Sequence, residues 1–596
     1  MPISRVRLLA GVAGLTLIAA AALAQQRPES ILPPGFGDSS SAPAPAPAPT
    51  PSATQRVESS AVPPVPSASG SSVPDASGLP PTPSPTPTPD PETLAQYELP
   101  DFARRSLAQV GAAGSVQGGV AADAFGDANG PMIEALMRGL HGPIASRWLS
   151  IALRRALVSP LDTPAGLNGA DFAAERAWLL VRMGEAVAAR SVVQGVDDAN
   201  YTPKLYQVAM QVALATGEPA ALCPLVDEAV ARDPERAWAL VKPICVSLAG
   251  TPGAAMPLLA AVRRRHVASG IDYLLAQKIV GAGGQGRQAV TIEWDAVSQL
   301  TAWRFGLATA TGVAIPDALY ATVGPQVAGW RALSPSIAAA DRAAPADRAA
   351  MMGVLSSAAL VDLYASLNEA QDEAAGASEI SDDLRAAYED PTPEARRAAL
   401  VRLWGGQTSR TPYARIILTA QAAARLQPDK ADADTDRLVA AMLSAGMDRT
   451  AERWRGQVGE GGDAWAMLLL ADPDAAGSMS YGTIGRYAGA GDAALKQRLL
   501  FAGLAGLGRL SPDDVERGAK ALDVRLGLQN SWTRALDRAA RRNQPGMVLL
   551  LAAVGMQSAD WRGVSPEALY RIVEALRATG QDGPARMIAA EAIART

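Results

Sequence analysis

The chain has 596 residues and a formal net charge of −5 at pH 7. This net negative charge does not favour binding to nucleic acid. With only two histidines in the chain, histidine-based catalysis is not expected. Aromatic residues make up 5% of the chain and runs of β-branched residues are rare, so helix is the expected state. Six of the 54 basic residues are lysines, while alanine, glycine, proline and arginine are abundant, which is typical of a GC-rich bacterial genome.

The first 24 residues have the features of a secretory signal peptide. Arg5 and Arg7 precede an apolar run, and the run closes with an A-x-A cleavage motif that ends at Ala24. We therefore expect residues 1–24 to be removed and the mature chain to begin at Gln25. The protein is then expected in the periplasm of a Gram-negative cell or secreted, with no transmembrane span. An uncleaved membrane anchor is the alternative, for which the apolar run is short.

Residues 25–92 are predicted to form a disordered, proline-rich linker. Between Pro33 and Pro91, 18 of the 59 residues are prolines, and alanine, serine and threonine make up most of the rest. Such a segment buries too little apolar surface to offset the entropy of ordering it, and it reaches up to about 3.1 Å per residue when extended. The segment ESILPPGFGD at 29–38 is either a short docking motif or ordinary linker sequence.

Four glycines mark a repeat of 33 residues that follows a predicted N-terminal helical region. This region covers 93–169 and contains a glycine-rich loop at about 111–130. An apolar helical stretch stands before each glycine and another after it, so each glycine is predicted to be a left-handed C′ residue within a helical hairpin. The turn glycines are Gly184, Gly217, Gly250 and Gly283.

The second repeat unit resembles the tetratricopeptide-like superfamily of helical-hairpin proteins. Gly217 stands at the turn between the helices, Ala229 lies in the second helix and Pro234 follows it, as in the pattern of that family. The resemblance covers residues 170–300. It implies stacked antiparallel hairpins in an α-solenoid, with an extended concave face available to a ligand.

The two cysteines of the chain, Cys223 and Cys245, each stand 11 residues from Pro234. Because Pro234 and the aspartate before it are predicted to form the turn of an antiparallel hairpin, the two sulfur atoms can meet. In an oxidising compartment this spacing favours a disulfide bond; two free buried thiols, and a metal or catalytic pair, are the alternatives. No neighbouring histidine pair completes a zinc site. Pro224 and Pro243 are expected to interrupt helices in this region.

Residues 301–596 are predicted to contain irregular helical repeats, with helix-Gly-helix units around Gly446 and Gly580. The expected fold is therefore all-α: an irregular α-solenoid of hairpins, preceded by the signal peptide and the linker. Four tryptophans are expected on repeat helices, where they are predicted to pack in the core rather than contact a ligand. They are Trp178, Trp238, Trp294 and Trp303.

Several short patterns resemble known sites without meeting all their requirements. GAGGQG at 281–286 matches G-x-G-x-x-G, but it follows a segment with helical spacing and coincides with a repeat turn. DADTD at 432–436 resembles the start of a calcium loop, but Arg437 replaces the glycine, so acidic capping of the next helix is predicted. RRRH at 263–266 either complements a helix C-terminus or forms a patch for an anionic lipid or glycan. The acidic run at 369–394 is expected to be a solvated face.

The sequence contains no G-x-S-x-G elbow, P-loop or H-E-x-x-H motif, so we expect no catalytic, cofactor-binding or metal-binding residues and no cofactor. Two carboxylates facing one groove could still act as acid and base. The architecture is similar to the non-catalytic superhelix of the soluble lytic transglycosylases, although helical sequence continues to Thr596 where their catalytic domain would be expected.

These expectations favour a scaffold or adaptor of the cell envelope that binds a protein or peptide partner. A carboxylate-based enzyme or glycan-binding protein that acts on peptidoglycan is the second class. A secreted structural protein without a dedicated ligand is the third.

Overall fold

The structure, a computed structural model, describes residues 100, 103–232, 236–283, 290–369, 375–406, 411–428, 434–475 and 478–596. The predicted signal peptide and nearly all of the predicted linker therefore lie outside the described residues. The chain divides into two compact units, of which one comprises Gly35–Arg104 and the other Met1–Pro34 with Arg105–Thr596. In the first of these units, the N–H of Ala103 donates a hydrogen bond to the carbonyl of Pro100.

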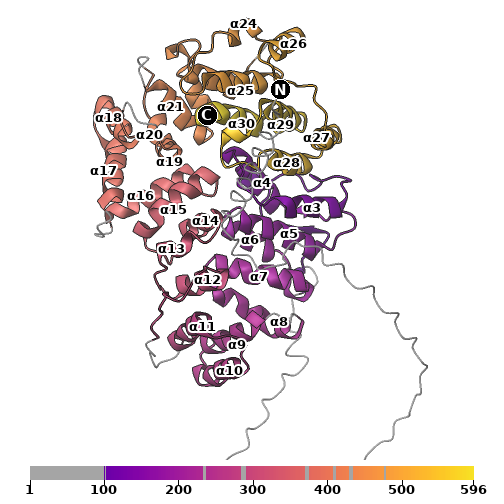
Figure 1. The fold of residues 1–596 in the computed structure, drawn as a ribbon, viewed down its shortest axis with the longest axis vertical. Helices are drawn as coiled ribbons and strands as arrows, with labels where there is room; N and C mark the ends of the chain where they lie inside the picture. The colour runs from indigo at the N-terminus through magenta and orange to yellow at the C-terminus, as the bar shows by residue number, and fades with distance from the viewer. Residues whose placement is uncertain are drawn as a thin grey trace, which may run out of the picture. The chain divides into compact units, whose positions relative to one another are not determined.

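The described part of Arg105–Thr596 is mainly helical, which confirms the all-α prediction (Figure 1). Its first elements, with 3₁₀ helices marked η, are β1 Gln109–Val110, η2 Ser115–Gln117, α3 Gly130–Gly139, α4 Arg147–Val158, β2 Leu161–Asp162, α5 Gly169–Arg182, α6 Ala186–Val193 and η3 Asp198–Asn200. The short antiparallel pairing of β1 with β2, which the sequence did not predict, is the single sheet among the described residues.

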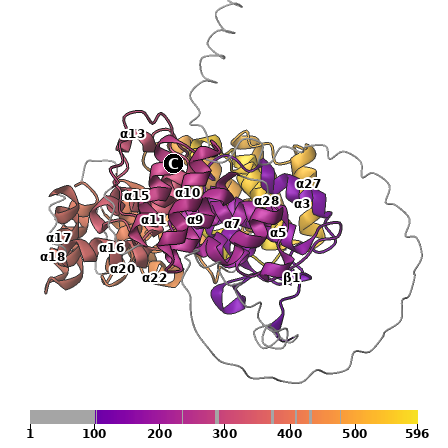
Figure 2. The same ribbon diagram turned by 90° about the horizontal axis from the view of Figure 1, so that it is seen from below.

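The repeat region forms successive hairpins, and Figure 2 shows α5, α7, α9 and α10 following one another. Its elements are α7 Pro203–Ala215, η4 Pro219–Leu225, α8 Val226–Arg232, α9 Arg236–Leu248, α10 Pro252–Arg264 and α11 Gly270–Ala282. Within it, α7 packs against α5 and α6, while α9 packs against η4, α10 and α11. Adjacent hairpins therefore share one continuous apolar core.

After the repeat region the chain returns along the helices that it has already formed. The returning elements are α12 Ala302–Ala310, α13 Asp317–Tyr320, α14 Gln326–Leu333, α15 Ala339–Met352, α16 Ser357–Glu369, α17 Ala375–Glu389, α18 Pro393–Leu403, α19 Tyr413–Leu418 and α20 Ala420–Ala424. Helix α12 packs on α7, α14 on α6, and α15 on α4. These long-range contacts add to the neighbour contacts expected of an α-solenoid.

Two glycines explain how closely the returning helices approach. A Cβ atom on Gly306 would lie 2.6 Å from the carbonyl oxygen of Leu214, and one on Gly329 would lie 2.6 Å from the carbonyl oxygen of Gly184. Beside this second contact, the indole of Trp330 donates a hydrogen bond to the carbonyl oxygen of Val181 at 3.1 Å. A larger residue at position 306 or 329 would force the layers apart.

The last part of the chain packs back onto the first. Its elements are α21 Thr435–Ser444, α22 Asp448–Glu452, η5 Arg455–Gln457, α23 Asp463–Ala471, α24 Tyr481–Ile484, α25 Ala493–Gly506, α26 Pro512–Ala521, α27 Ser531–Arg541, α28 Pro545–Gly555, η6 Trp561–Gly563, α29 Pro566–Ala578 and α30 Asp582–Arg595. Helix α30 packs against α4, α21, α23, α25 and α29, and α28 packs against α3 and α4. Figure 1 shows the yellow C-terminal helices beside indigo α4.

Local sequence explains where many of these helices begin. In four of them a Ser or Thr side chain accepts a hydrogen bond from the N–H three residues ahead, and a proline occupies the first helical position. The hydroxyl group pairs with one backbone N–H that has no partner within the helix. The proline has no backbone N–H that would need a partner. The pairs are Thr202-Pro203, Thr392-Pro393, Ser511-Pro512 and Ser565-Pro566.

The turn glycines behave as predicted at three of the four repeat positions. Gly184, Gly217 and Gly250 have φ of 87°, 70° and 85°, and each follows the first helix of its hairpin. Gly283 differs, because its φ is −73°. Glycine is needed there for space: a Cβ atom would lie 2.5 Å from the hydroxyl oxygen of Ser247.

Two further expectations about the repeat region are wrong. Helix α9 continues through Pro243, although proline removes one backbone hydrogen bond, because the face carrying Trp238 and Ile244 is buried against the neighbouring helices. The predicted helix after Gly283 is not found at 290–300, which is irregular, so Trp294 does not lie on a helix. Residues 284–289 are outside the described part of the chain.

Candidate functional site

A cavity of about 750 Å³ lies where six segments of the second half of the chain meet. The N-terminal turns of α19, α21, α23 and α25 line it, together with η6 and the end of α30. Its lining carries four acidic and four basic side chains. The acids are Asp436, Asp463, Asp492 and Asp560, and the bases are Arg437, Lys496, Arg562 and Arg595.

The most buried charges of the cavity form a cluster around Asp463, at the first residue of α23. One carboxylate oxygen of Asp463 accepts a hydrogen bond from the Lys496 ammonium at 2.7 Å, and the other accepts one from the hydroxyl of Tyr487. All three side chains are largely buried. Burial raises the pKa of Tyr487, and its hydrogen bond to Asp463 raises it further, so the phenol remains a donor.

Gly489 makes this cluster sterically possible. A Cβ atom at this position would lie 2.0 Å from a carboxylate oxygen of Asp463 and 2.1 Å from the hydroxyl oxygen of Tyr487. Real Cβ atoms do not approach other heavy atoms so closely. The backbone at Gly489 therefore closes directly over the Asp463–Tyr487 hydrogen bond.

Asp436 lies in the first turn of α21 and faces the same cavity. One of its oxygens accepts a hydrogen bond from the N–H of Ala464 at 2.7 Å, so this carboxylate caps α23. Although the Asp436 residue is exposed, desolvation by the surrounding protein raises the pKa of its carboxyl group above its usual range, and the neighbouring Asp463 carboxylate adds to the rise. Asp463 and Asp436 thus face one cavity, and Asp463 is paired with the buried ammonium group of Lys496.

Two arginines of the cavity are held by the fold. Arg437 donates a hydrogen bond to the carbonyl of Gly406 at 2.8 Å. Arg595 pairs with Glu591 at 2.6 Å, donates to the carbonyl of Ala145 at 2.7 Å and stacks over Tyr413. These contacts anchor both guanidinium groups in the cavity wall.

The part of the cavity lining that η6 contributes makes fewer polar contacts with the rest of the fold. Asp560 caps η6 by accepting a hydrogen bond from the N–H of Arg562 at 2.9 Å. The Arg562 side chain is exposed and forms no ion pair with any residue that the structure describes. Its guanidinium is therefore the cavity cation with the greatest freedom to bind a ligand.

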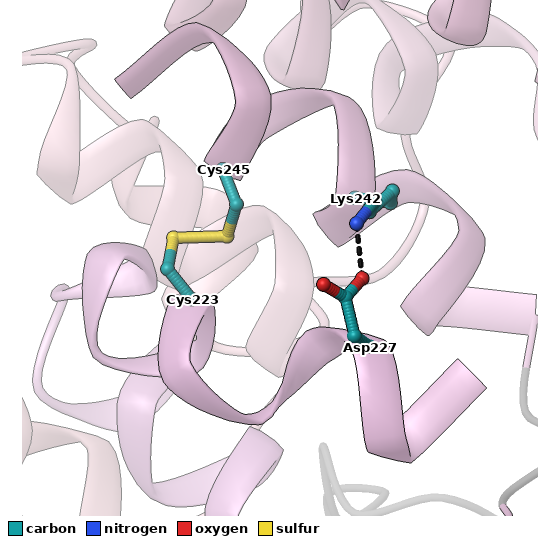
Figure 3. Close-up of a disulfide and its surroundings, with 4 residues drawn as sticks. All are labelled: Cys223, Asp227, Lys242 and Cys245. Atoms are coloured by element: carbon teal, nitrogen blue, oxygen red, sulfur yellow. Dashed lines mark hydrogen bonds and ion pairs between the residues drawn. A yellow bond between two sulfur atoms is a disulfide. The ribbon is translucent and has the colours of Figure 1, made fainter. Parts of the chain in front are cut away.

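The structure brings the two predicted cysteines together (Figure 3). The Sγ atoms of Cys223 in η4 and Cys245 in α9 are 2.08 Å apart, at bonding distance, and their Cα atoms are separated by 5.2 Å. Asp227 and Lys242 form an ion pair beside them, between α8 and α9. The predicted turn residues, 233 and 234, lie outside the described residues. The cysteines are not part of the cavity.

The other sequence patterns lie apart from one another. Helix α11 extends into the first two residues of GAGGQG, where a dinucleotide site requires a preceding strand. Residues 284–286 of the motif are outside the described part. In DADTD, Asp434 is the N-cap residue of α21 without a side-chain cap bond, and Asp436 caps α23 rather than its own helix. Trp178 and Trp238 are buried as predicted, whereas Trp303 is half-buried.

Sequence reasoning did not single out Asp463, Lys496 or Tyr487. An aspartate at a helix start is typical of capping, and nothing local distinguishes one that also pairs with a lysine 33 residues away. Gly489 is a sequence signal of possible close packing, but the sequence does not show which side chains approach it.

Comparison with known proteins finds no matching family model, no matching curated protein and no matching solved structure. Among the described residues, no cluster of three or more His, Cys, Asp or Glu side chains could hold a metal ion. In the same part of the chain, no helix combines the length and the apolar character that a membrane crossing requires.

Proposed function

We propose that the protein is a scaffold or adaptor of the bacterial cell envelope, and that the polar cavity holds a charged segment of a protein or peptide partner. The observation that carries the proposal is the lining of the cavity by four acids and four bases from separate segments. A peptide segment presents both signs of charge together with backbone donors and acceptors, and such a lining complements them.

The arrangement of the charges favours binding over chemistry. Asp463 is paired with Lys496, Asp492 caps α25 by accepting a hydrogen bond from the N–H of Leu495, and Asp560 caps η6. Fixed partners of this kind hold the wall of a binding site in one geometry, which lowers the entropy lost when a ligand binds. The exposed Arg562 can then contact the bound segment.

The location in an oxidising compartment outside the cytoplasm is part of the proposal. The signal-like N-terminus and the two cysteines at bonding distance support it, because disulfide bonds persist in the periplasm and outside cells. Repeated hairpins offer an extended surface, so the α-solenoid class of scaffold remains the architecture that we propose.

Site-specific photo-cross-linking in intact cells tests the scaffold function. A photoreactive residue at Arg562 should capture a defined envelope protein or peptide, and Asp436→Asn should reduce the yield because it removes a cavity charge while keeping the oxygen that caps α23. The same photoreactive residue at Arg449, whose exposed ion pair with Asp474 lies outside the cavity lining, is the control. Identical adducts from both positions, or none from Arg562, would contradict the proposal.

A second candidate is a carboxylate-dependent enzyme or binder of peptidoglycan. The raised pKa of the Asp436 carboxyl group favours this candidate. Asp436 shares the cavity with Asp463, which is paired with Lys496. Two carboxyl groups in such unequal environments could act as an acid and a base. Incubation of purified protein with peptidoglycan sacculi decides the case. Release of soluble fragments that is lost in Asp436→Asn would favour the enzyme, whereas co-sedimentation without release would favour a glycan binder.

A further inference from the structure

The first three turns of helix α10 and the turn before the helix form an uncharged surface. No charged residue stands between Lys242 and Arg263 in the sequence. A helix at a protein surface normally carries charged or polar residues on its outer face. On α10, however, the exposed positions of the first three turns include Ala254, Pro257 and Leu258.

The apolar groups on this surface are accessible to solvent. Leu248, at the end of α9, has 45% of its surface exposed, and Leu258 has 40%. The two hydroxyl side chains between residues 246 and 262 are both committed within the fold: Ser247 donates to the carbonyl of Val280 and Thr251 to that of Val246. The surface therefore offers no free side-chain hydrogen bond with which to specify a partner.

A basic cluster follows this apolar stretch directly. Arg263, Arg264, Arg265 and His266 are all exposed at the end of α10. Arg263 stacks over Tyr273 with its guanidinium 5.7 Å from the ring centre, and none of the three arginines forms an ion pair with a described residue. By helical spacing, Leu258, Ala261 and Arg265 lie on one side of α10.

We propose that the α10 face, defined as Leu248, Ala254, Pro257, Leu258 and the cluster 263–266, docks on an anionic lipid surface. The cluster 263–266 gives this face a positive charge, although the chain as a whole is acidic. A shallow apolar stripe flanked by arginines suits lipid headgroups and the outer acyl region. The arginines alone would also suit an acidic protein, but the uncharged stripe beside them favours the outer acyl region of a lipid surface.

Vesicle co-sedimentation tests this interaction with the protein as isolated from the cell envelope. Vesicles of phosphatidylcholine alone are compared with vesicles that also contain phosphatidylglycerol. Sedimentation is expected with the anionic vesicles, and high salt should weaken it. A triple Arg263→Gln, Arg264→Gln, Arg265→Gln variant should bind more than about tenfold less tightly. Leu258→Glu should also lose binding, since it places a carboxylate at the lipid surface.

The matched control removes three other exposed arginines, in a triple Arg449→Gln, Arg486→Gln, Arg517→Gln variant. These side chains are 74%, 59% and 64% exposed, so the net charge changes equally while the α10 face is unaltered. Binding should then be reduced by much less than in the α10 variant. Equal losses in the two triple variants, equal binding to both vesicle types, or no vesicle binding would overturn the proposal. Binding of a labelled polyglutamate peptide without vesicle binding would also overturn it and assign the face to an acidic protein.

Discussion

Glu185 lies in the turn between α5 and α6, where 5% of its surface is exposed. Its carboxylate accepts a hydrogen bond from Arg154 at 3.0 Å. Burial raises the pKa of Glu185 to about 7, although the positive charge of Arg154 opposes the rise. The folded protein therefore retains this proton at pH values where the unfolded chain, with a pKa of 4.5, has released it.

This difference predicts a pH dependence of stability. Between pH 4.5 and pH 7 the unfolded state binds fewer protons than the folded state at this group. The contribution of Glu185 is therefore fully present below pH 4.5 and is lost as the pH rises through about 7. The steepest loss is about 1.4 kcal/mol per pH unit. In Glu185→Gln the loss should be absent, and urea unfolding of both proteins across this range measures the difference. Parallel curves would contradict the assignment.

Gly489 is the second position at which one residue determines a local structure. Gly489→Ala should separate Asp463 from Tyr487 and disturb the buried Lys496 pair, which we expect to lower the free energy of unfolding by about 3 kcal/mol. Gly459→Ala is the control, because a Cβ atom there meets no heavy atom within 4 Å. Chemical denaturation of both variants provides the measurement. A near-neutral Gly489→Ala would show that the cluster tolerates the added methyl group.

At the scale of elements, the hairpin of η4, α8 and α9 differs from its neighbours. Pro224 lies within η4, so this segment is a 3₁₀ helix rather than the start of a regular α-helix, and Val230 on α8 remains exposed. The hairpin therefore buries less apolar surface than two full α-helices would. A covalent link between η4 and α9 would compensate for this loss.

The cysteine pair should contribute measurably to stability. A bond across 22 residues of sequence is expected to stabilise the protein by about 3 kcal/mol through the reduced entropy of the unfolded chain. Mass spectrometry of unreduced protein should find one cross-linked peptide containing Cys223 and Cys245. Two alkylatable thiols in protein isolated without a reductant would contradict this prediction. Thermal unfolding of the double Cys→Ala variant measures the energy.

At the scale of the whole of Arg105–Thr596, helix α4 joins the beginning of this unit to its end. Glu591 on α30 accepts hydrogen bonds from the backbone N–H groups of Arg147 and Trp148 and from the hydroxyl of Ser146. The buried Arg147 guanidinium donates to the carbonyls of three residues on later parts of the chain. They are Ala350, Leu355 and Ser444.

Removing Glu591 should therefore open the molecule at this junction. Glu591→Ala leaves buried donors unpaired, so we expect a loss of about 3 to 5 kcal/mol in the free energy of unfolding. Hydrogen exchange should increase at the start of α4 and in α30 but not in α9 and α10. Glu460→Ala, which breaks an exposed pair with Arg486, should change little. Uniform loss of protection would show that the junction does not open separately.

The sequence predicted features that depend on neighbouring residues. Helical spacing with few aromatic residues predicted the all-α class, and the glycines at 184, 217 and 250 predicted hairpin turns that the structure confirms. The equal spacing of the two cysteines from one hairpin turn also predicted that their sulfur atoms meet, as the structure shows. The helix expected after Gly283 is absent from the described residues 290–300, because apolar spacing alone does not ensure a partner for the buried face.

By itself, then, the amino-acid sequence determined helix content, several helix starts and the hairpin turns, because caps, prolines and left-handed glycines act within a few residues. The tertiary structure alone decided that α12 returns to α7, that Glu591 meets Arg147, and that Asp436 and Asp463 face one cavity. These contacts join residues from 27 to 444 positions apart. They depend on which buried faces fit together, and local preferences do not encode that fit.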